Sequence, residues 1–349
     1  MNNILTAQEL KDEIKFGLSG TYLFFGEEEY MKHYYLGEIR KKVLGEDGDA
    51  IFRHKKISCA ELDLEKIADA LTTASLGFFS EGQTLVELHE IQFSALKEAE
   101  WKALLEMLSG AADDVIAVVY AVDGELETGM LPKAPSKQLS RLMEHVKPVY
   151  FAREGEMKLA KWAAKHFTAE KLSFENGVCE QMVAYCGRDM FVLSNEIEKI
   201  CAYVKMKGET VIKNEDVKKV CSRNLEINAF DFSNALLNQE TDRALEIIAD
   251  MKLRKEKPVY VLGSVLKVVS DLYTVKVLTE SGYNDTEISK QLKLHEYKVK
   301  LYRQSSSRRN LARLKRLLEI CTETDIKLKS TSLDDYTELD KLVILASSR

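Results

Sequence analysis

The sequence is poor in residues that break regular structure or crosslink a chain. It contains only 4 prolines, 17 glycines and 6 cysteines among 349 residues. This scarcity excludes collagen-like, proline-rich and loop-dominated chains and favours helices. The six cysteines form no C-x-x-C pair and no short-range cluster with histidine, so neither a disulfide framework nor a zinc site is predicted. We expect them to be reduced residues of hydrophobic cores.

The sequence also lacks long uncharged apolar runs. Its N-terminal stretch carries a charge every few residues, which argues against a signal peptide. No later segment reaches the roughly 18 apolar residues that a membrane helix needs. The formal net charge of −6 gives no overall basic field that would attract nucleic acid or membrane. A cytoplasmic location is therefore expected.

The composition, with 45% apolar and 30% charged residues, is typical of a globular protein of two or three domains. In the first 150 residues, short apolar runs alternate with amphipathic helical patterns. This alternation predicts an α/β domain whose parallel sheet carries helices on its faces. We expect strands near 22–25, 51–57, 84–88, 115–122 and 149–151, and helices at 29–43, 60–73, 94–109 and 136–146.

Strand signals stop after about residue 152, and the remaining sequence reads as helix. A small helical domain is predicted for residues 151–221 and a larger one for residues 222–349, after the α/β domain of residues 1–150. The helices expected in the small domain are 156–170, 175–186, 189–205 and 214–221. Those expected in the larger one are 228–238, 241–254, 258–280, 285–292, 295–304, 308–329 and 335–346.

The end of the first expected strand argues against nucleotide binding. A phosphate-binding loop would place G-x-x-x-x-G-K-[ST] here. The chain instead has Gly26 followed by the three carboxylates of Glu27, Glu28 and Glu29, which repel a triphosphate. Hydrolase and metalloprotease motifs are also absent, and the six histidines have no visible catalytic partners. No catalytic, nucleotide-binding or metal-binding residues and no cofactor are predicted.

Two features remain unexplained by this framework. The first is the segment Leu76-Gly77-Phe78-Phe79, which lies between an expected helix and the strand at 84–88. Two adjacent side chains cannot both point into one core from regular structure. Either both rings fold beneath the edge of the sheet, or they form an exposed apolar wedge for a partner's pocket.

The second feature is a basic stretch at residues 290–316, where ten lysines and arginines face a single acidic residue, Glu296. It is either the solvated face of a helical bundle or a contact with nucleic-acid phosphates or an acidic neighbouring subunit. The basic residues are Lys290, Lys293, Lys298, Lys300, Arg303, Arg308, Arg309, Arg313, Lys315 and Arg316. A weak helix-turn-helix pattern overlaps this stretch.

Five segments, in order, resemble a known family. They are Tyr22-Leu23-Phe24-Phe25-Gly26-Glu27-Glu28-Glu29-Tyr30, Leu76-Gly77-Phe78-Phe79-Ser80 with Gln83-Thr84-Leu85-Val86, Cys186-Gly187-Arg188-Asp189-Met190 with Leu193-Ser194-Asn195-Glu196-Ile197-Glu198-Lys199-Ile200, Ile227-Asn228-Ala229-Phe230-Asp231-Phe232, and Asp325-Ile326-Lys327-Leu328-Lys329-Ser330. Together they resemble the delta subunits of the bacterial DNA polymerase III clamp loader, over nearly the whole chain.

The resemblance implies a divergent AAA+ module without ATPase activity, made of a RecA-like domain, a helical lid and a helical collar. It implies that a pair of adjacent apolar residues opens the ring-shaped beta sliding clamp. By position these are Phe78 and Phe79, with Leu76 as a supporting contact. Gly77 departs from the commonest family forms and makes the pose of Leu76 less fixed.

The implied partners are the sliding clamp, the gamma/tau and delta prime subunits through the collar, and primed DNA in the assembled complex. Subunit contact then becomes the favoured role of the basic stretch, including Lys298, Lys300, Arg303, Arg308 and Arg309. Two alternatives remain: a helical nucleic-acid-binding module using residues 285–316, and an active AAA+ ATPase.

Overall fold

The computed structural model describes residues 4–45, 53–72, 82–131, 133–222, 225–294, 296–307, 309–330 and 335–347. These residues form two compact units, Met1–Leu159 and Ala160–Arg349. The α/β part predicted for residues 1–150 lies in the first unit. The predicted boundary between residues 221 and 222 lies inside the second unit, between two helices, and stays a prediction.

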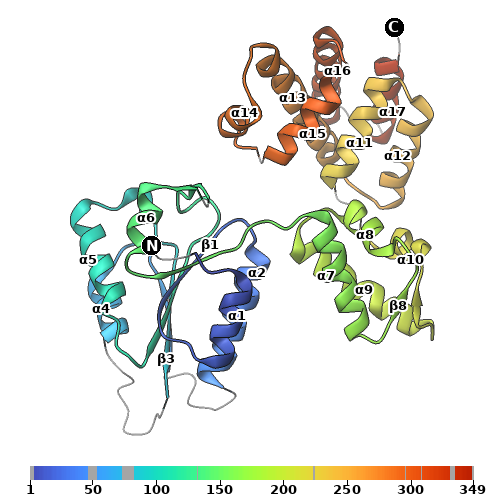
Figure 1. Cartoon of the computed structure of the whole chain (residues 1–349). Helices are drawn as coiled ribbons and strands as arrows, with labels where there is room; N and C mark the ends of the chain where they lie inside the picture. The colour runs from blue at the N-terminus through green and yellow to red at the C-terminus, as the bar shows by residue number, and fades with distance from the viewer. Residues whose placement is uncertain are drawn as a thin grey trace. The chain divides into compact units, whose positions relative to one another are not determined.

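A five-stranded parallel sheet forms the centre of the first unit (Figure 1). The strand order is β2-β3-β4-β1-β7, so the chain crosses over the sheet between most successive strands. The strands are β1 (Gly20–Phe25), β2 (His54–Ser58), β3 (Thr84–His89), β4 (Val115–Tyr120) and β7 (Lys147–Tyr150). All five correspond to runs predicted from the sequence.

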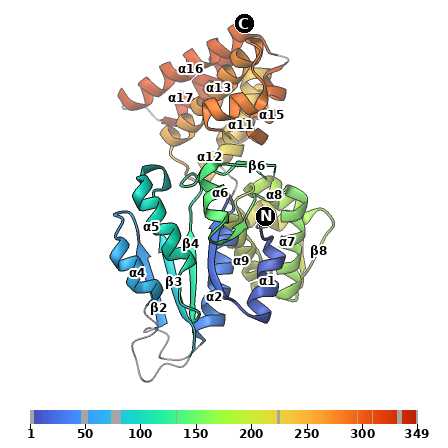
Figure 2. The same cartoon turned by 60° about the vertical axis from the view of Figure 1, so that its left-hand side comes forward.

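Helices cover both faces of this sheet, as parallel strands require (Figure 2). In β1, Tyr22 and Phe24 pack on the face covered by α1 and α2, whereas Leu23 and Phe25 pack on the opposite face with α4, α5 and α6. The alternation follows from the two-residue period of a strand. The helices are α1 (Ala7–Phe16), α2 (Glu29–Leu44), α4 (Leu64–Thr72), α5 (Glu98–Ser109) and α6 (Lys137–Met143), with a 3-10 turn at Phe93–Ala95.

Helix α1 was missed at the sequence level, although the sequence contains a signal for it. Thr6 and Glu9 form a capping box: the Thr6 hydroxyl accepts from the Glu9 backbone N–H, and the Glu9 carboxylate accepts from the Thr6 N–H. The Thr-x-x-Glu spacing is the usual signature of this motif. The short antiparallel pair β5 (Gly129–Met130) and β6 (Ala134–Pro135) was also not predicted.

The first part of the second unit contains four helices and one strand pair. The helices lie close to their predicted positions: α7 (Glu156–Ala169, whose first turn belongs to the first unit), α8 (Val178–Cys186), α9 (Met190–Met206) and α10 (Asn214–Val220). The parallel pair β8 (Ser173–Phe174) and β9 (Val211–Ile212) corrects the all-helical prediction for this region. Each strand has only two residues, too few to show an alternating pattern.

The remainder of the second unit is helical and is built around α13 (Pro258–Glu280). Its buried residues, including Val265, Val269 and Leu272, share one core with the helices around it. The other helices are α11 (Leu225–Asn238), α12 (Thr241–Leu253), α14 (Asp285–Leu292), α15 (Glu296–Ser307), α16 (Leu311–Ser330) and α17 (Asp335–Ser347). All seven were predicted, and the predicted fold class is confirmed.

Membrane insertion finds no support in these helices. Among the described residues, none of the helices combines the length and the apolar character needed to cross a bilayer. The longest apolar helix, α13, has its apolar residues in the core of the second unit.

Candidate functional site

Gly26 ends β1 at the position where a phosphate-binding loop would begin. Its φ of 113° favours glycine, and a Cβ atom there would lie 2.4 Å from the Phe151 carbonyl oxygen. The neighbouring backbone is bonded to the same residue, because the Phe151 N–H donates to Phe25 O (2.9 Å) and the Glu28 N–H donates to Phe151 O (3.0 Å). This glycine therefore serves a close crossing of two chain segments.

Glu29, the first residue of α2, is held by three donors from the chain itself. Its carboxylate accepts hydrogen bonds from Lys32 Nζ (2.6 Å), the Tyr120 hydroxyl (2.7 Å) and the Asp123 N–H (3.0 Å). Burial alone would raise the pKa of the Glu29 carboxyl, but these bonds outweigh it and leave the pKa lowered. The carboxylate is therefore charged at neutral pH and already bonded.

Lys32 is the only lysine among the described residues that is buried, with no exposed surface. Besides Glu29, its ammonium group donates to the Ala121 carbonyl oxygen (2.7 Å), and it lies over the Tyr120 ring. A lysine near the first strand could be mistaken for one that holds phosphates. Here the ammonium is already bonded to the Glu29 carboxylate and the Ala121 carbonyl oxygen, which leaves it poorly placed for that role.

A buried carboxylate, Glu87, lies within β3 on the face of the sheet that α2 covers. Arg40 binds it through two parallel hydrogen bonds of 2.6 and 2.7 Å, and the Nε2 atoms of His54 and His89 lie 2.7 and 3.0 Å from its oxygens. Burial would raise the pKa of the Glu87 carboxyl. The hydrogen bonds from Arg40, His89 and His54 overcome this effect and hold the pKa well below its usual range.

This cluster was missed at the sequence level. His54 and His89 are half-buried, and both have a carboxylate partner that the sequence did not reveal. The signal was Glu87, a carboxylate inside the apolar run Thr84–His89, because such a charge is rarely buried without partners. No nucleophile accompanies the cluster among the residues described, so it has the character of a structural network.

The predicted wedge residues Leu76, Phe78 and Phe79 lie outside the described residues. The chain on both sides of them is described, and both sides bond to one connection, residues 110–114 between α5 and β4. Before the wedge, Leu71 O accepts from the Ala112 N–H (3.0 Å). After it, the Thr84 N–H donates to Asp114 O (2.8 Å). The described residues on either side of segment 73–81 are thus held by this connection, at the edge where the strands begin.

Arg53 strengthens the second of these attachments. Its buried guanidinium donates to the carbonyl oxygens of Val43 (2.9 Å), Leu44 (3.0 Å) and Gln83 (3.1 Å). It therefore joins the C-terminal end of α2 to the residue just before β3. The Gln83 side chain adds a bond from Nε2 to Leu18 O (3.2 Å). The sequence carried no sign of this arrangement, because its partners are backbone carbonyls.

Two described arginines of the basic stretch have partners within the second unit. Arg303 pairs with Asp285 (2.8 Å) and donates to Tyr283 O (2.8 Å). Arg309 donates to Asn234 Oδ1 (3.1 Å) and Asn238 Oδ1 (3.0 Å), and burial lowers the pKa of its guanidinium. These bonds favour a structural role for both arginines.

The predicted contact residues Lys298 and Lys300 lie on α15. Lys300 is exposed, whereas Lys298 is half-buried and lies over the ring of Tyr302. Arg308 lies outside the described residues. Of the four predicted residues that the structure describes, Arg303 and Arg309 form internal bonds and Lys300 is exposed, and a role of the stretch in binding stays a prediction.

Comparisons with known proteins bear on the whole chain. A family model described as DNA polymerase III delta subunit, C-terminal domain, matches residues 226–345. The chain is 23% identical over 340 residues to DNA polymerase III subunit delta of Bacillus subtilis, covering 93% of this chain and 91% of that protein. It is 22% identical over 301 residues to the probable DNA polymerase III subunit delta of Aquifex aeolicus, covering 84% and 82%.

A solved structure shows the same fold. The DNA clamp loader delta protein of Bacillus subtilis superposes with a TM-score of 0.73 at 20% identity, covering 98% of this chain and all of that one. The resemblance to clamp-loader delta subunits that the five segments indicated is thereby confirmed.

Proposed function

We propose that this chain acts as the delta subunit of a bacterial DNA polymerase III clamp loader and opens the beta sliding clamp for loading onto primed DNA. The observation that carries the proposal is similarity along almost the full length to DNA polymerase III delta subunits, in sequence and in fold. Its site of action would be the cytoplasm. The proposed parts are a RecA-like domain at residues 1–150, a lid at 151–221 and a collar at 222–349.

The subunit is proposed to have no catalytic activity of its own. Support comes from the carboxyl end of the sheet, where open α/β sheets usually bind ligands. There the Lys32 ammonium is bonded to Glu29 and Ala121, and three carboxylates follow Gly26. ATP binding at this point would require breaking the Lys32–Glu29 pair, in which the lysine is buried, and would place a triphosphate beside like charges.

Phe78 and Phe79, supported by Leu76, are the proposed contact with the clamp. Burying two phenylalanine side chains in a pocket yields about 1.5–3 kcal/mol each before the cost of ordering them. Two adjacent rings suit a small, releasable anchor of this kind. The bonds of Leu71, Gln83 and Thr84 support the assignment, because they fix both ends of the segment that carries the rings.

Binding alone would not open a ring. The wedge contributes to opening only if it binds the open or strained clamp more tightly than the closed one, because a ligand shifts an equilibrium by its difference in affinity. Nucleotide binding on the neighbouring gamma/tau subunits would then control access to the wedge. The collar is proposed to join this chain to those subunits and to delta prime, with Lys298, Lys300 and Arg308 among the contact candidates.

The test is direct binding of the full-length chain to the sliding clamp of its own bacterium. The Phe78→Ala/Phe79→Ala variant is compared with wild type and with Phe16→Ala. Phe16 is a matched control, since it is 80% exposed on α1 and lies outside the proposed contact. We expect the double variant to lose at least about 100-fold in affinity with an unchanged melting temperature, and the control to bind normally.

Other results would count against the proposal in separate ways. Clamp binding that survives the double change would reject the wedge residues while leaving the clamp-loader role. If wild type does not bind the clamp at all, the role itself is rejected. If a wild-type chain that does not bind the clamp binds DNA with a strong dependence on salt, the result would instead favour a nucleic-acid-binding module at residues 285–316.

A further inference from the structure

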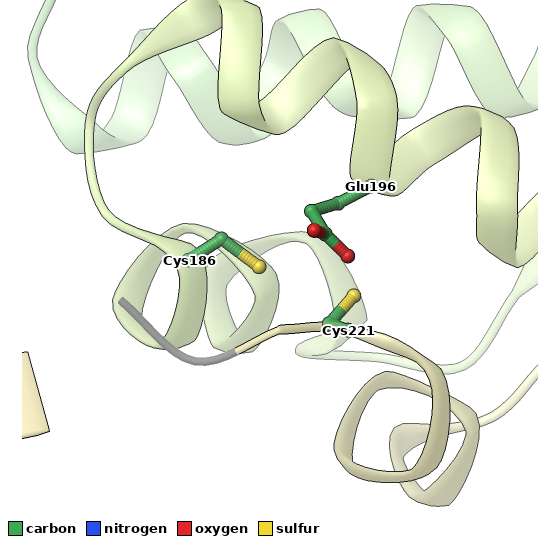
Figure 3. A group of neighbouring side chains, drawn as sticks. All are labelled: Cys186, Glu196 and Cys221. Atoms are coloured by element: carbon green, nitrogen blue, oxygen red, sulfur yellow. The ribbon is translucent and has the colours of Figure 1, made fainter. Parts of the chain in front are cut away.

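Three buried side chains converge in the first part of the second unit. Cys186 is the last residue of α8, Glu196 lies in α9, and Cys221 directly follows α10. Their exposed fractions are 0%, 5% and 1%. Figure 3 shows the two sulfur atoms and the carboxylate pointing toward one another. Two thiols and a carboxylate thus meet in the interior from three different elements.

The separations match the needs of a single metal ion. One ligand atom of each residue lies within 4.8 Å of the other two, and no other described residues form such a group of metal-ligating side chains. Zinc binds sulfur at about 2.3 Å and carboxylate oxygen at about 2.0–2.2 Å, which puts tetrahedral ligands less than about 4 Å apart. A small inward adjustment of the side chains would therefore suffice.

The surrounding contacts hold these ligands in place. One oxygen of Glu196 accepts a hydrogen bond from the Ser222 N–H (3.1 Å) and forms an ion pair with Lys199 Nζ (2.7 Å). Both backbone polar groups of Cys221 are hydrogen-bonded. Its N–H donates to Val217 O (3.0 Å), and its carbonyl oxygen accepts from Arg254 Nη1 (3.3 Å). Such partners orient ligands before the metal arrives.

We propose that Cys186, Glu196 and Cys221 bind one zinc ion, with water as the fourth ligand. Each thiol releases its proton on binding, so the ligands carry three negative charges. The zinc ion supplies two positive charges and Lys199 supplies the third, which leaves the buried group neutral. Thiolate ligands favour zinc over magnesium and calcium, which prefer sites made of oxygen.

The ion would have a structural role. It would join the ends of α8 and α10 to the middle of α9, next to the start of α11. No sequence motif indicates it, because the ligands are separated by 10 and 25 positions and include no C-x-x-C pair. The proposal does not depend on the clamp-loader role, and its test involves neither clamp nor DNA.

The test is a cobalt titration of the full-length protein, stripped of metal with a chelator and kept reduced with a phosphine. Cobalt replaces zinc in tetrahedral sites and reports thiolate ligands by charge-transfer absorption. We expect one cobalt ion per chain with this absorption and with the intense visible bands of a tetrahedral site. Zinc should abolish both signals and raise the melting temperature.

Variants assign the ligands. Cys186→Ser and Cys221→Ser should each halve the charge-transfer absorption and lower the affinity at least about tenfold. Glu196→Gln should keep the absorption but weaken binding. Cys201→Ala is the matched control, because Cys201 is buried on α9 but outside the cluster, and it should titrate like wild type. Circular dichroism before each titration establishes that the variant is folded.

Two results would overturn the proposal. One is a folded wild-type protein that shows no stoichiometric thiolate–cobalt absorption. The other is an absorption that Cys186→Ser and Cys221→Ser leave intact, or that Cys201→Ala removes as well. The wild-type titration decides the first point even if a variant does not fold.

Discussion

The two edges of the β-sheet use their polar groups in different ways. Where the strands end, and on the sheet face that α2 covers, side chains bond to side chains: Lys32 and Tyr120 to Glu29, and Arg40 to Glu87. At the edge where the strands begin, the bonds that fix segment 73–81 run mostly to backbone carbonyls, as those of Arg53 do.

This difference separates two tasks within one fold. Paired charges fill the edge at which related architectures bind ligands, so this edge contributes to stability. Backbone bonds at the opposite edge hold the described residues on either side of the proposed wedge segment. Changes at the first edge should therefore alter stability without altering clamp binding, whereas changes at the second should alter clamp binding.

The largest effect is expected from Lys32→Met. This change leaves Glu29 without its ammonium partner, and the free energy of unfolding should fall by about 2–3 kcal/mol, less than for a fully buried pair because Glu29 is partly exposed. Urea denaturation measures the change. Lys41→Met, which breaks an exposed pair with Glu38 of similar geometry, is the control and should change the free energy of unfolding much less.

Clamp affinity of folded Lys32→Met should equal that of wild type. A loss of clamp affinity comparable with that of the Phe78→Ala/Phe79→Ala variant would contradict the assignment of stability to one edge of the sheet and clamp binding to the other.

A smaller effect, dependent on pH, is expected from Glu87→Gln. The folded-state pKa of Glu87 lies below its ordinary value of 4.5. The charged carboxylate therefore stabilises the fold above about pH 4.5, and this contribution is lost as the pH falls from there toward the lowered pKa.

Denaturation at a series of pH values tests this expectation. At neutral pH the glutamine variant should be less stable by about 1.5–3 kcal/mol, and the difference should shrink on acidification. Glu98→Gln removes an exposed carboxylate that pairs with Arg141 and should change the profile less. If the difference in stability between wild type and Glu87→Gln stays constant down to strongly acidic pH, the charge of Glu87 does not contribute to stability.

The smallest effect is expected from Gln83→Leu. It removes the bond to Leu18 O and should cost about 0.5–1.5 kcal/mol of stability. Because Gln83 lies beside the proposed wedge segment, clamp affinity should also fall a few-fold. Gln8→Leu on α1 is the control and should leave both quantities unchanged. Unchanged affinity in Gln83→Leu would mean that the bond to Leu18 does not help to position the wedge.

The predictability of each region follows from the kind of interaction that forms it. The strand Val115–Tyr120 and the helix Pro258–Glu280 were predicted because their buried positions are occupied by apolar residues, which form a recognisable pattern in the sequence. The two-residue strands β8 and β9 were not, since they have no room for a pattern. The partners of Arg53 are backbone carbonyls, which every residue possesses, so no sequence motif could reveal them.

The glycine that ends β1 has a consequence for how such chains are sorted by sequence. Gly26 is kept free of a side chain by the carbonyl group of Phe151, a requirement of packing that would persist in any relative with the same crossing. A sequence search that takes a glycine after the first strand as evidence of a former phosphate-binding loop would therefore classify this chain as an ATPase that has lost its activity. The lysine and serine or threonine that complete such a loop are the safer criterion, because packing at this crossing does not demand them.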